Sequence, residues 1–186
     1  MIQTTRLQLL PCTLKYFEAV LHGNEALAQL LGADVPEDWT EFPEMVLVAY
    51  DKMRNDPTLL GWFFYLAVHR ADNRLIGTAS FKGRPDANGA VEIGYEVSSA
   101  YREQGYATEI AQTLIRFAFS HPQVTKVIAH TLEEYNAAVK VLQKAGMHFA
   151  GTVNSTDADE LWRWEIAREQ YETSNDNTAH QSAGGQ

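Results

Sequence analysis

The sequence predicts an α+β fold of the α/β-like kind, in which helices flank a mixed, mostly antiparallel central sheet. Apolar and polar residues alternate over residues 91–97, the pattern of a strand with one buried face. Directly afterwards, over residues 107–118, apolar residues recur at helical spacing. The dipeptide Asn88-Gly89 before the strand is a strong hairpin signal. These three observations predict antiparallel strands followed by a helix that crosses back over the sheet.

The N-terminal part of the chain predicts one strand and three helices. Alternating apolar residues predict a strand over residues 5–10. Thr13 and Asn24 are typical helix caps, so we expect a short helix after each of them. Helical spacing of apolar residues over 42–53 predicts a third helix, after a loop over 32–40.

The middle of the chain predicts the centre of the sheet. Strands over 61–69 and 75–81 precede the strand over 91–97, which makes three antiparallel strands in succession. The helix that begins near residue 105 ends before Pro122. A strand rich in β-branched residues follows over 124–130, and the right-handed crossover rule places it parallel to the strand over 91–97.

The C-terminal part predicts a helix, two strands and a tail. Asn136 is a typical N-cap and Gly146 a typical C-terminal cap of the helix between them. Two strands are expected over 152–166. We expect one domain over residues 1–168 and a mobile tail over 169–186, because that segment is polar and has no periodicity.

The composition predicts a single globular domain. The 186 residues, 45% of them hydrophobic, can bury one sizeable core. The single cysteine, Cys12, excludes an internal disulfide framework, and no Cys/His cluster has zinc spacing, so we expect no metal. No stretch has the length of a bilayer span or the pattern of a signal peptide. We therefore expect a cytoplasmic protein with no membrane partner.

The net charge of −9 at pH 7 argues against nucleic acid as a partner, since phosphates would be repelled. An acidic surface suits a cationic acceptor, although the charge can equally serve only to keep the protein in solution. A homodimer is left open, because Trp62 or Trp162 can pack either in the core or at a dimer contact.

Between the strand over 91–97 and the next helix lies a turn with residues suited to an anion. Small residues at Gly105 and Ala107 let a diphosphate approach the backbone donors of a helix N-terminus. Arg102 can add a charge-assisted contact to phosphate oxygens. The alternative is that the glycine only makes a turn. The turn lacks the G-x-G-x-x-G spacing of a dinucleotide fold.

The residues Arg102-x-x-Gly105-x-Ala107 resemble the acetyl-CoA signature R/Q-x-x-G-x-G/A of the GNAT superfamily of N-acetyltransferases. The resemblance extends over residues 5–167 to the RimJ/RimL-like branch, on the ordered segments VEIGYEV, YREQGYATE, VIAHTLEEYN and AAVKVLQKAGM. It implies a single-domain GNAT fold with splayed neighbouring parallel strands. It also implies an acetyl-CoA-dependent N-acetyltransferase whose acceptor is a primary amine of a small molecule or a protein N-terminus.

In the resembled family the pantetheine arm of the cofactor lies between the splayed strands. The backbone of Tyr95 and Val97 would hold that arm here, because splayed strands leave donors and acceptors free. Asn136 has two interpretations, an N-cap, which its position favours, or a contact to the CoA arm. The turn residues that the resemblance implies in cofactor binding are Arg102, Glu103, Gln104, Gly105, Tyr106, Ala107 and Thr108.

The resemblance also implies an acceptor side in the region of residues 42–53. Trp39 and Phe42 are therefore candidates for substrate contact, with core packing as the alternative. The loops over 32–40 and 84–90, which would choose the acceptor, carry no recognisable code.

Acyl transfer to an amine requires a base, because an ammonium group has no free lone pair. Glu92 is our candidate, since related acetyltransferases often use a glutamate on this strand, directly or through a water. Glu96 shares its face of the strand and is the alternative. Both can also merely line a solvated face of the sheet.

The group that protonates the leaving thiolate is less clear from the residues. The family's tyrosine position is Leu142 here, and the serine position of the RimJ/RimL-like branch is Ala138. Tyr135 and His130 are nearby substitutes, with structural roles as the alternative. A thiol also leaves readily near neutral pH without a dedicated acid. The missing hydroxyls motivate a rival function, a non-catalytic CoA-binding sensor or interaction domain.

Overall fold

The computed structural model describes residues 1–134, 136–154 and 160–174. The strands are β1 (Ile2–Gln3), β2 (Leu7–Pro11), β3 (Phe64–His69), β4 (Arg74–Phe81), β5 (Ala90–Val97), β6 (Lys126–Leu132), β7 (His148–Asn154) and β8 (Glu160–Ala167). The helices are α1 (Leu14–Leu21), α2 (Asn24–Leu31), α3 (Pro43–Asn55), α4 (Tyr106–Phe119) and α5 (Ala137–Lys144), with short 3-10 turns at η1 (Pro57–Leu59) and η2 (Ser99–Tyr101).

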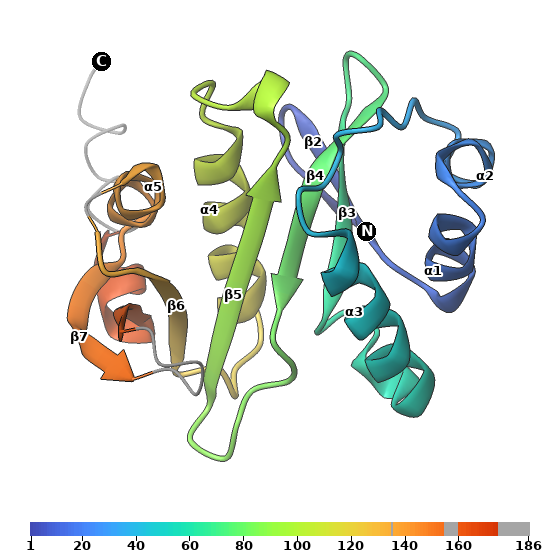
Figure 1. Cartoon of the computed structure of the whole chain (residues 1–186). Coiled ribbons are helices and arrows are strands. Elements are labelled where there is room, and N and C mark those ends of the chain that lie inside the picture. Colours follow the sequence, from blue (N-terminus) through green and yellow to red (C-terminus); the bar gives the residue numbers. More distant parts are fainter. Residues whose placement is uncertain (135, 155–159, 175–186) are drawn as a thin grey trace, which may run out of the picture.

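The strands form one sheet in the order β1-β2-β3-β4-β5-β6-β8-β7 (Figure 1). Neighbouring strands are antiparallel except β5 and β6, which are parallel. The structure confirms the predicted mixed, mostly antiparallel sheet and the parallel placement that the crossover rule required. The two-residue edge strand β1 was not predicted, because it is too short to show a period.

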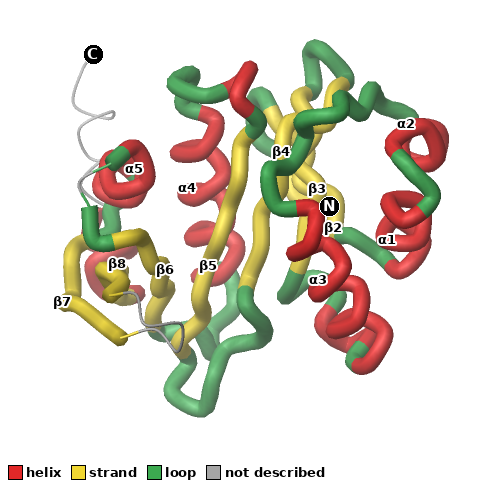
Figure 2. Tube along the Cα trace, viewed as in Figure 1, coloured by secondary structure: helices red, strands yellow, loops and turns green. Residues whose placement is uncertain are grey.

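Helices cover both faces of the sheet, and this arrangement explains why β3 is apolar along most of its length. Tyr65 and Ala67 belong to the core under α4, whereas Leu66 and Val68 belong to the core under α1, α2 and α3. Figure 2 shows α4 on the opposite side of the sheet from α3. Over β4 and β5 the α3 face is not covered by a helix, and this open face holds the candidate site.

The hairpin predicted at Asn88-Gly89 joins β4 to β5 and requires its glycine. The Asp86 carboxylate accepts hydrogen bonds from the backbone N–H of Asn88 at 2.8 Å and of Ala90 at 2.9 Å. Gly89 has a φ of 78°, and a Cβ there would lie 2.4 Å from the carbonyl oxygen of Gln123. The absence of a side chain thus lets the segment before β6 approach the turn.

β5 and β6 are neighbours only where they begin. Residues 90–92 pair with residues 126–128, and no further register joins the two strands in the part of the chain that is described. Over residues 93–97, β5 pairs with β4 along its other edge. The parallel strands therefore splay apart after the third pair, as the sequence resemblance implied.

The chain continues in a helical conformation over residues 168–174, although we expected a mobile tail from residue 169. The Arg168 guanidinium donates to three backbone carbonyls at 2.7 to 3.0 Å, those of Phe119 at the end of α4 and of His121 and Val124 just after it. The Tyr171 ring lies 4.9 Å from the Phe119 ring, centroid to centroid. One aromatic and one arginine thus attach a segment whose composition is otherwise polar. Residues 175–186 lie outside the described residues.

Candidate active site

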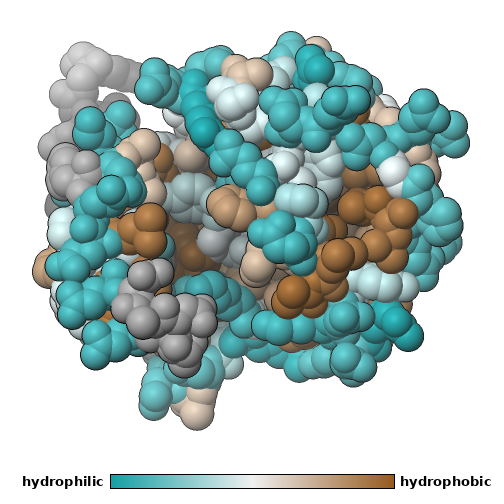
Figure 3. Space-filling view, viewed as in Figure 1, coloured by the Kyte–Doolittle hydropathy of each residue, from teal (hydrophilic) through white to brown (hydrophobic). Residues whose placement is uncertain are grey.

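A cleft of about 930 Å³ crosses the open face of the sheet from α3 to α5. Figure 3 shows the surface hollowed between these two helices. Residues of α3, β4, β5, the turn before α4 and the start of α5 line it. The cleft therefore connects the strand edge that β6 leaves open with the N-terminus of α4.

Nine of the ten residues that we predicted to bind the cofactor line this cleft. They are Tyr95, Val97, Arg102, Glu103, Gly105, Tyr106, Ala107, Thr108 and Asn136. Gln104 is the exception, because its side-chain amide donates to the carbonyl of Ala100 at 3.0 Å. A role of these residues in cofactor binding stays a prediction, but one cleft brings together segments that are up to 41 residues apart in the chain.

The N-terminus of α4 faces the cleft. Gly105 precedes the helix with a φ of 83°, a left-handed conformation that favours glycine. Ala107 and Thr108 lie in the first turn, whose backbone N–H groups have no partner within an α-helix. An anion in this part of the cleft can therefore meet backbone donors and the positive end of the helix dipole.

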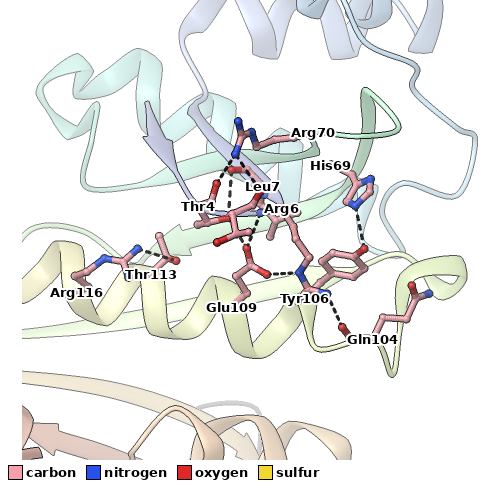
Figure 4. Close-up of polar contacts among 11 residues, drawn as sticks. Thr4, Arg6, Leu7, His69, Arg70, Gln104, Tyr106, Glu109, Thr113 and Arg116 are labelled. Carbon is pink, nitrogen blue, oxygen red and sulfur yellow. Dashed lines mark hydrogen bonds and ion pairs between the residues drawn. The ribbon is translucent and has the colours of Figure 1, made fainter. Parts of the chain in front are cut away.

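Arg6 holds this turn from behind, as Figure 4 shows. Its Nη1 donates to the carbonyl of Gln104 at 2.8 Å, and its Nε contacts the Glu109 carboxylate at 2.6 Å. The guanidinium lies 4.1 Å from the centroid of the Tyr106 ring. Arg6 therefore connects the residue before Gly105 with two residues of α4, a role that sequence reasoning missed because about a hundred residues separate them.

The carboxylate of Glu109 accepts hydrogen bonds from both Thr4 and Arg6. Burial alone would raise its pKa, but hydrogen bonds from the Thr4 hydroxyl, the Arg6 side chain and the Arg6 backbone outweigh burial and lower the pKa of Glu109. Glu109 is thus charged at neutral pH and holds β2 and α4 together.

Tyr106 is fixed from its other end by a buried histidine. The Tyr106 hydroxyl lies 2.9 Å from His69 Nε2, and His69 Nδ1 lies 2.9 Å from the Asp72 carboxylate (Figure 4 draws the first contact). The Tyr101 hydroxyl donates to the same carboxylate at 2.6 Å, and this hydrogen bond is the largest cause of the lowered pKa of Asp72. The two tyrosines at the edge of the cleft are therefore held in place by one network.

Arg102 lines the cleft but is not free of protein partners. Its Nε donates to the carbonyl of Val97 at 3.0 Å, and its Nη2 lies 2.7 Å from the Glu41 carboxylate. The side chain is 46% exposed. Arg102 can therefore meet an anion from this position, in exchange for or beside Glu41.

The open edge of β5 presents its backbone to the cleft. The Glu92 carbonyl accepts a hydrogen bond from the Lys82 N–H on β4. Because backbone groups alternate between the two edges of a strand, those of Tyr95 and Val97 point away from β4, toward the gap. The gap thus offers strand groups of Tyr95 to an amide-bearing arm, whereas the Val97 carbonyl already accepts from Arg102 Nε.

Glu92 sits beside this gap and bridges it. His130 on β6 places its Nδ1 3.0 Å from the Glu92 carboxylate, and Lys82, directly after β4, makes an ion pair with the same group. Lys82 lines the cleft, whereas Glu92 and His130 lie next to it. Glu92 and His130 are 23% and 19% exposed. No local pattern in the sequence predicted that these two candidates would be partners.

Glu96 lines the cleft itself and is bound to the loop before α3. The Thr40 hydroxyl donates to its carboxylate at 2.8 Å, and the backbone N–H of Glu41 donates to the other oxygen. Residues 40 and 41 were not predicted as site residues, and no local pattern marks them. These two hydrogen bonds to Glu96 hold the loop before α3 at the edge of the site.

The remaining candidates divide into core, cap and cleft positions. Leu142 is 1% exposed and belongs to the core, whereas Ala138 lines the cleft. Asn136 Oδ1 accepts from the N–H of Ala138 at 2.9 Å, so the N-cap interpretation holds, and the residue also lines the cleft. Tyr135 lies outside the described residues.

The two aromatic candidates for substrate contact separate. Trp39 is 3% exposed in the core under α1, α2 and α3, so the packing interpretation is the correct one for it. Phe42 is 51% exposed and lines the cleft.

A sequence profile of the acetyltransferase (GNAT) domain matches residues 6–148. The chain belongs to the GNAT acetyltransferase family. It is 26% identical over 149 residues to the uncharacterized N-acetyltransferase YjdG of Bacillus subtilis (strain 168), which covers 78% of this chain and 88% of YjdG. The family and the class of this relative confirm that the GNAT protein described here is an N-acetyltransferase.

Solved structures agree with this GNAT chain in fold. RimL, a ribosomal L7/L12 alpha-N-protein acetyltransferase in complex with coenzyme A, matches with a TM-score of 0.65 and 16% identity, over 88% of this chain and 95% of RimL. The aminoglycoside acetyltransferase AAC(6')-Ib, also in complex with coenzyme A, matches with a TM-score of 0.62 and 16% identity, over 91% and 99% of the two chains. The predicted GNAT fold is thereby confirmed.

The charge of the cleft fits an anionic cofactor. On a chain of net charge −9, the described lining carries five basic side chains against three acidic ones. The basic residues are Lys52, Lys82, Arg102, Lys140 and Lys144, and the acidic ones are Glu41, Glu96 and Glu103. Among the described residues, no group of three His, Cys, Asp or Glu is placed to hold a metal ion, and no helix is both long and apolar enough to cross a bilayer.

Proposed function

We propose that this protein transfers the acetyl group of acetyl-CoA to a primary amine of a small molecule or a protein N-terminus, as a member of the RimJ/RimL-like branch. One observation carries the proposal: the open edge of β5 leads, within a single cleft, to the N-terminus of α4. The strand edge suits an amide-bearing arm and the helix end suits a diphosphate. We keep a cytoplasmic location as a prediction.

The cofactor half of the cleft comprises the turn before α4, the first turn of α4, and α5. Arg102, Lys140 and Lys144 supply positive charge there. Gly105, with a φ of 83°, makes the turn that leads into the N-terminus of α4 there. Asn136 already caps α5 with its Oδ1, so only its amide nitrogen remains for the cofactor arm, and that nitrogen contacts Glu134 at 3.0 Å.

Glu92 is the proposed base, acting directly or through a water. The ammonium first gives one proton to the base, and the neutral amine nitrogen then attacks the acetyl carbonyl carbon. As the carbon–sulfur bond breaks, the nitrogen loses its second proton and the sulfur takes up one, so that CoA leaves as the thiol and one proton passes to solvent. His130 Nδ1 lies 3.0 Å from the Glu92 carboxylate, within hydrogen-bond reach of the proposed base. Glu96 remains the alternative base, because it lines the cleft directly.

Proteins of the same fold support both kinds of acceptor. RimL is a protein N-terminal acetyltransferase and AAC(6')-Ib an aminoglycoside acetyltransferase. The CoA-binding sensor remains the second candidate, on the observation that Leu142 is buried and Ala138 brings no hydroxyl to the cleft.

The release of free CoA thiol, measured with a panel of amines, distinguishes the two. In Glu92→Gln we expect turnover at neutral pH to fall by a factor on the order of 10² to 10⁴ with nearly unchanged acetyl-CoA affinity. Glu96→Gln is the comparison on the same strand face, and a larger loss of turnover there would make Glu96 the base. Full activity in Glu92→Gln would remove Glu92 as the base, and tight acetyl-CoA binding without turnover of any amine would favour the sensor.

A further inference from the structure

The half of the cleft opposite α4 has a different chemistry from the cofactor half. Three large apolar side chains line it: Phe42, the residue before α3, and Met45 and Val48 on α3. Their exposed fractions are 51%, 54% and 47%. Figure 3 shows hydrophobic surface on the α3 side of the hollow. Large apolar side chains gathered on one exposed face mark a binding surface more often than a purely structural one.

The folding of α3 does not account for these side chains. The helix is held to the sheet by Val46, Ala49 and Met53, which are buried in the core. Phe42, Met45 and Val48 follow one another at three-residue spacing on the neighbouring face. One apolar face is enough to bury a surface helix, so the second face is available for a ligand.

The walls of this half are also aromatic. Phe63 and Phe64, at the start of β3, line it together with Phe81, at the end of β4. Phe64 is half-buried and can offer ring surface to a ligand, whereas Phe63 and Phe81 are 8% and 0% exposed and belong to the core. An apolar group that enters from the α3 side therefore finds partners on two sides.

The charges of this half suit a ligand with one positive charge. Among the described lining residues, Glu96 is the carboxylate that lies there without a basic partner, since Glu41 is paired with Arg102. Lys52 and Lys82 line the same half. A polycation would place its further ammonium groups against apolar side chains or lysines, at a desolvation cost that nothing repays.

We propose that the acetyl acceptor is a primary amine with a single positive charge, attached to an apolar body that is aromatic or branched aliphatic. The inference rests on the proposed function, because it assigns the acceptor of that same site. The amine lies on the side of the carboxylates, and the apolar body packs against α3. A free arylalkyl amine and a peptide with an apolar first residue share this chemistry.

A panel of acceptors tests the inference by the release of CoA thiol. We expect kcat/KM for phenylethylamine and isopentylamine to exceed that for ethanolamine and spermidine by on the order of tenfold or more. A peptide that begins with phenylalanine, compared with phenylethylamine, tells a protein N-terminus from a small molecule as the source. A preference for spermidine or ethanolamine would overturn the inference while leaving the proposed function in place.

A pair of variants on α3 distinguishes the effect of an apolar side chain that lines the cleft from that of an exposed apolar side chain outside it. Met45→Ser should raise KM for phenylethylamine on the order of tenfold, with an unchanged acetyl-CoA dissociation constant. Leu47→Ser is the matched control, because Leu47 is 49% exposed on the same helix and does not line the cleft. Equal effects of the two variants would overturn the inference.

Two further outcomes are distinguishable from these. A change in molecular mass by light scattering in Met45→Ser would show that the apolar face is a contact between copies of the chain, which overturns the assignment to an acceptor. Failure of acetyl-CoA to bind the unaltered protein would instead remove the proposed function, and the inference with it.

Discussion

At Glu109 the balance between burial and hydrogen bonding decides the charge of a single residue. Its pKa is lowered, so the charged carboxylate contributes stability above the ordinary glutamate pKa, and the contribution is lost as the pH falls through the lowered value. We expect the free energy of unfolding, measured by urea denaturation, to fall between about pH 6 and about pH 3, and to fall less in Glu109→Gln.

Glu172→Gln is the control for that measurement, since it removes an exposed carboxylate that pairs with Arg168 within one helical segment. It should leave the slope of stability against pH nearly unchanged. The same acid sensitivity in Glu109→Gln as in the unaltered chain would contradict the role given to Glu109.

Arg6 gives a second prediction at the scale of a residue. Lysine keeps the charge beside Glu109 but cannot also donate to Gln104 and cover Tyr106, because it lacks the planar fork. We expect Arg6→Lys to weaken acetyl-CoA binding on the order of tenfold, or about 1.4 kcal/mol, as measured by isothermal titration calorimetry.

Arg70→Lys provides the comparison for Arg6. Arg70 also lies on this side of the sheet and donates to the carbonyls of Thr4 and Thr5, but it does not contact the turn before α4 (Figure 4). Equal losses of affinity in the two variants would mean that Arg6 acts on the stability of β2 and not on the position of the turn.

The sequence indicated Gly105 but not Arg6, and the reason is physical. A glycine between a strand and a helix is a local signal, because glycine, which lacks a Cβ, is the residue that readily adopts a left-handed backbone conformation. The partner of a charged side chain about a hundred residues away depends on strand register, which no local pattern carries. Glu92 with His130, and Glu96 with Thr40, are hidden from the sequence in the same way.

Among the elements, α5 begins at a residue with two proposed roles: Asn136 caps the helix and is also a candidate contact for the cofactor arm. Asn136 accepts from the N–H groups of Ala138 and Val139 at 2.9 and 3.3 Å. Asn136→Ala should lower the free energy of unfolding by about 1 kcal/mol, because an N-cap is lost. Asn136→Ser should restore most of that stability, since serine is also a good N-cap.

The acetyl-CoA affinity of the two variants decides the second role of Asn136. If its amide also meets the cofactor arm, both variants should bind acetyl-CoA more weakly, although only one of them is less stable. Unchanged affinity in Asn136→Ser would leave Asn136 as a cap alone.

Elements with a clear period were predictable, and those without one were not. β5 and α4 follow from alternation and helical spacing, and their order predicted the parallel pairing with β6. The helical residues 168–174 have a polar composition and are held by contacts of Arg168 and Tyr171 that no window of sequence reveals. The splay of β5 and β6 came from a family resemblance and not from the residues themselves.

At the scale of the whole molecule, the distribution of charge distinguishes the cleft from the rest of the protein. The chain as a whole is acidic, yet the described lining of the cleft is basic in balance. The overall charge suited a cationic acceptor and argued against nucleic acid as a partner, but it could not reveal a local excess of lysine and arginine. The cleft has its own electrostatics because α3, the residue after β4, the turn before α4, and α5 each bring basic side chains to it from distant parts of the chain.

Thermal unfolding with and without acetyl-CoA tests whether the cleft binds acetyl-CoA at the N-terminus of α4. The three proteins compared are the unaltered chain, Gly105→Ala and Gly105→Glu. At about 100 times the dissociation constant, binding should add about 2.7 kcal/mol of stability to the unaltered chain. Gly105→Ala and Gly105→Glu share the strain of the left-handed conformation, and a Cβ at Gly105 meets only Arg6 Nη2, at 3.5 Å. We predict that the alanine variant keeps most of the shift and that the glutamate variant, which adds a negative charge at the N-terminus of α4, loses it. No shift in the unaltered chain at millimolar acetyl-CoA, or an equal shift in all three proteins, would contradict the account.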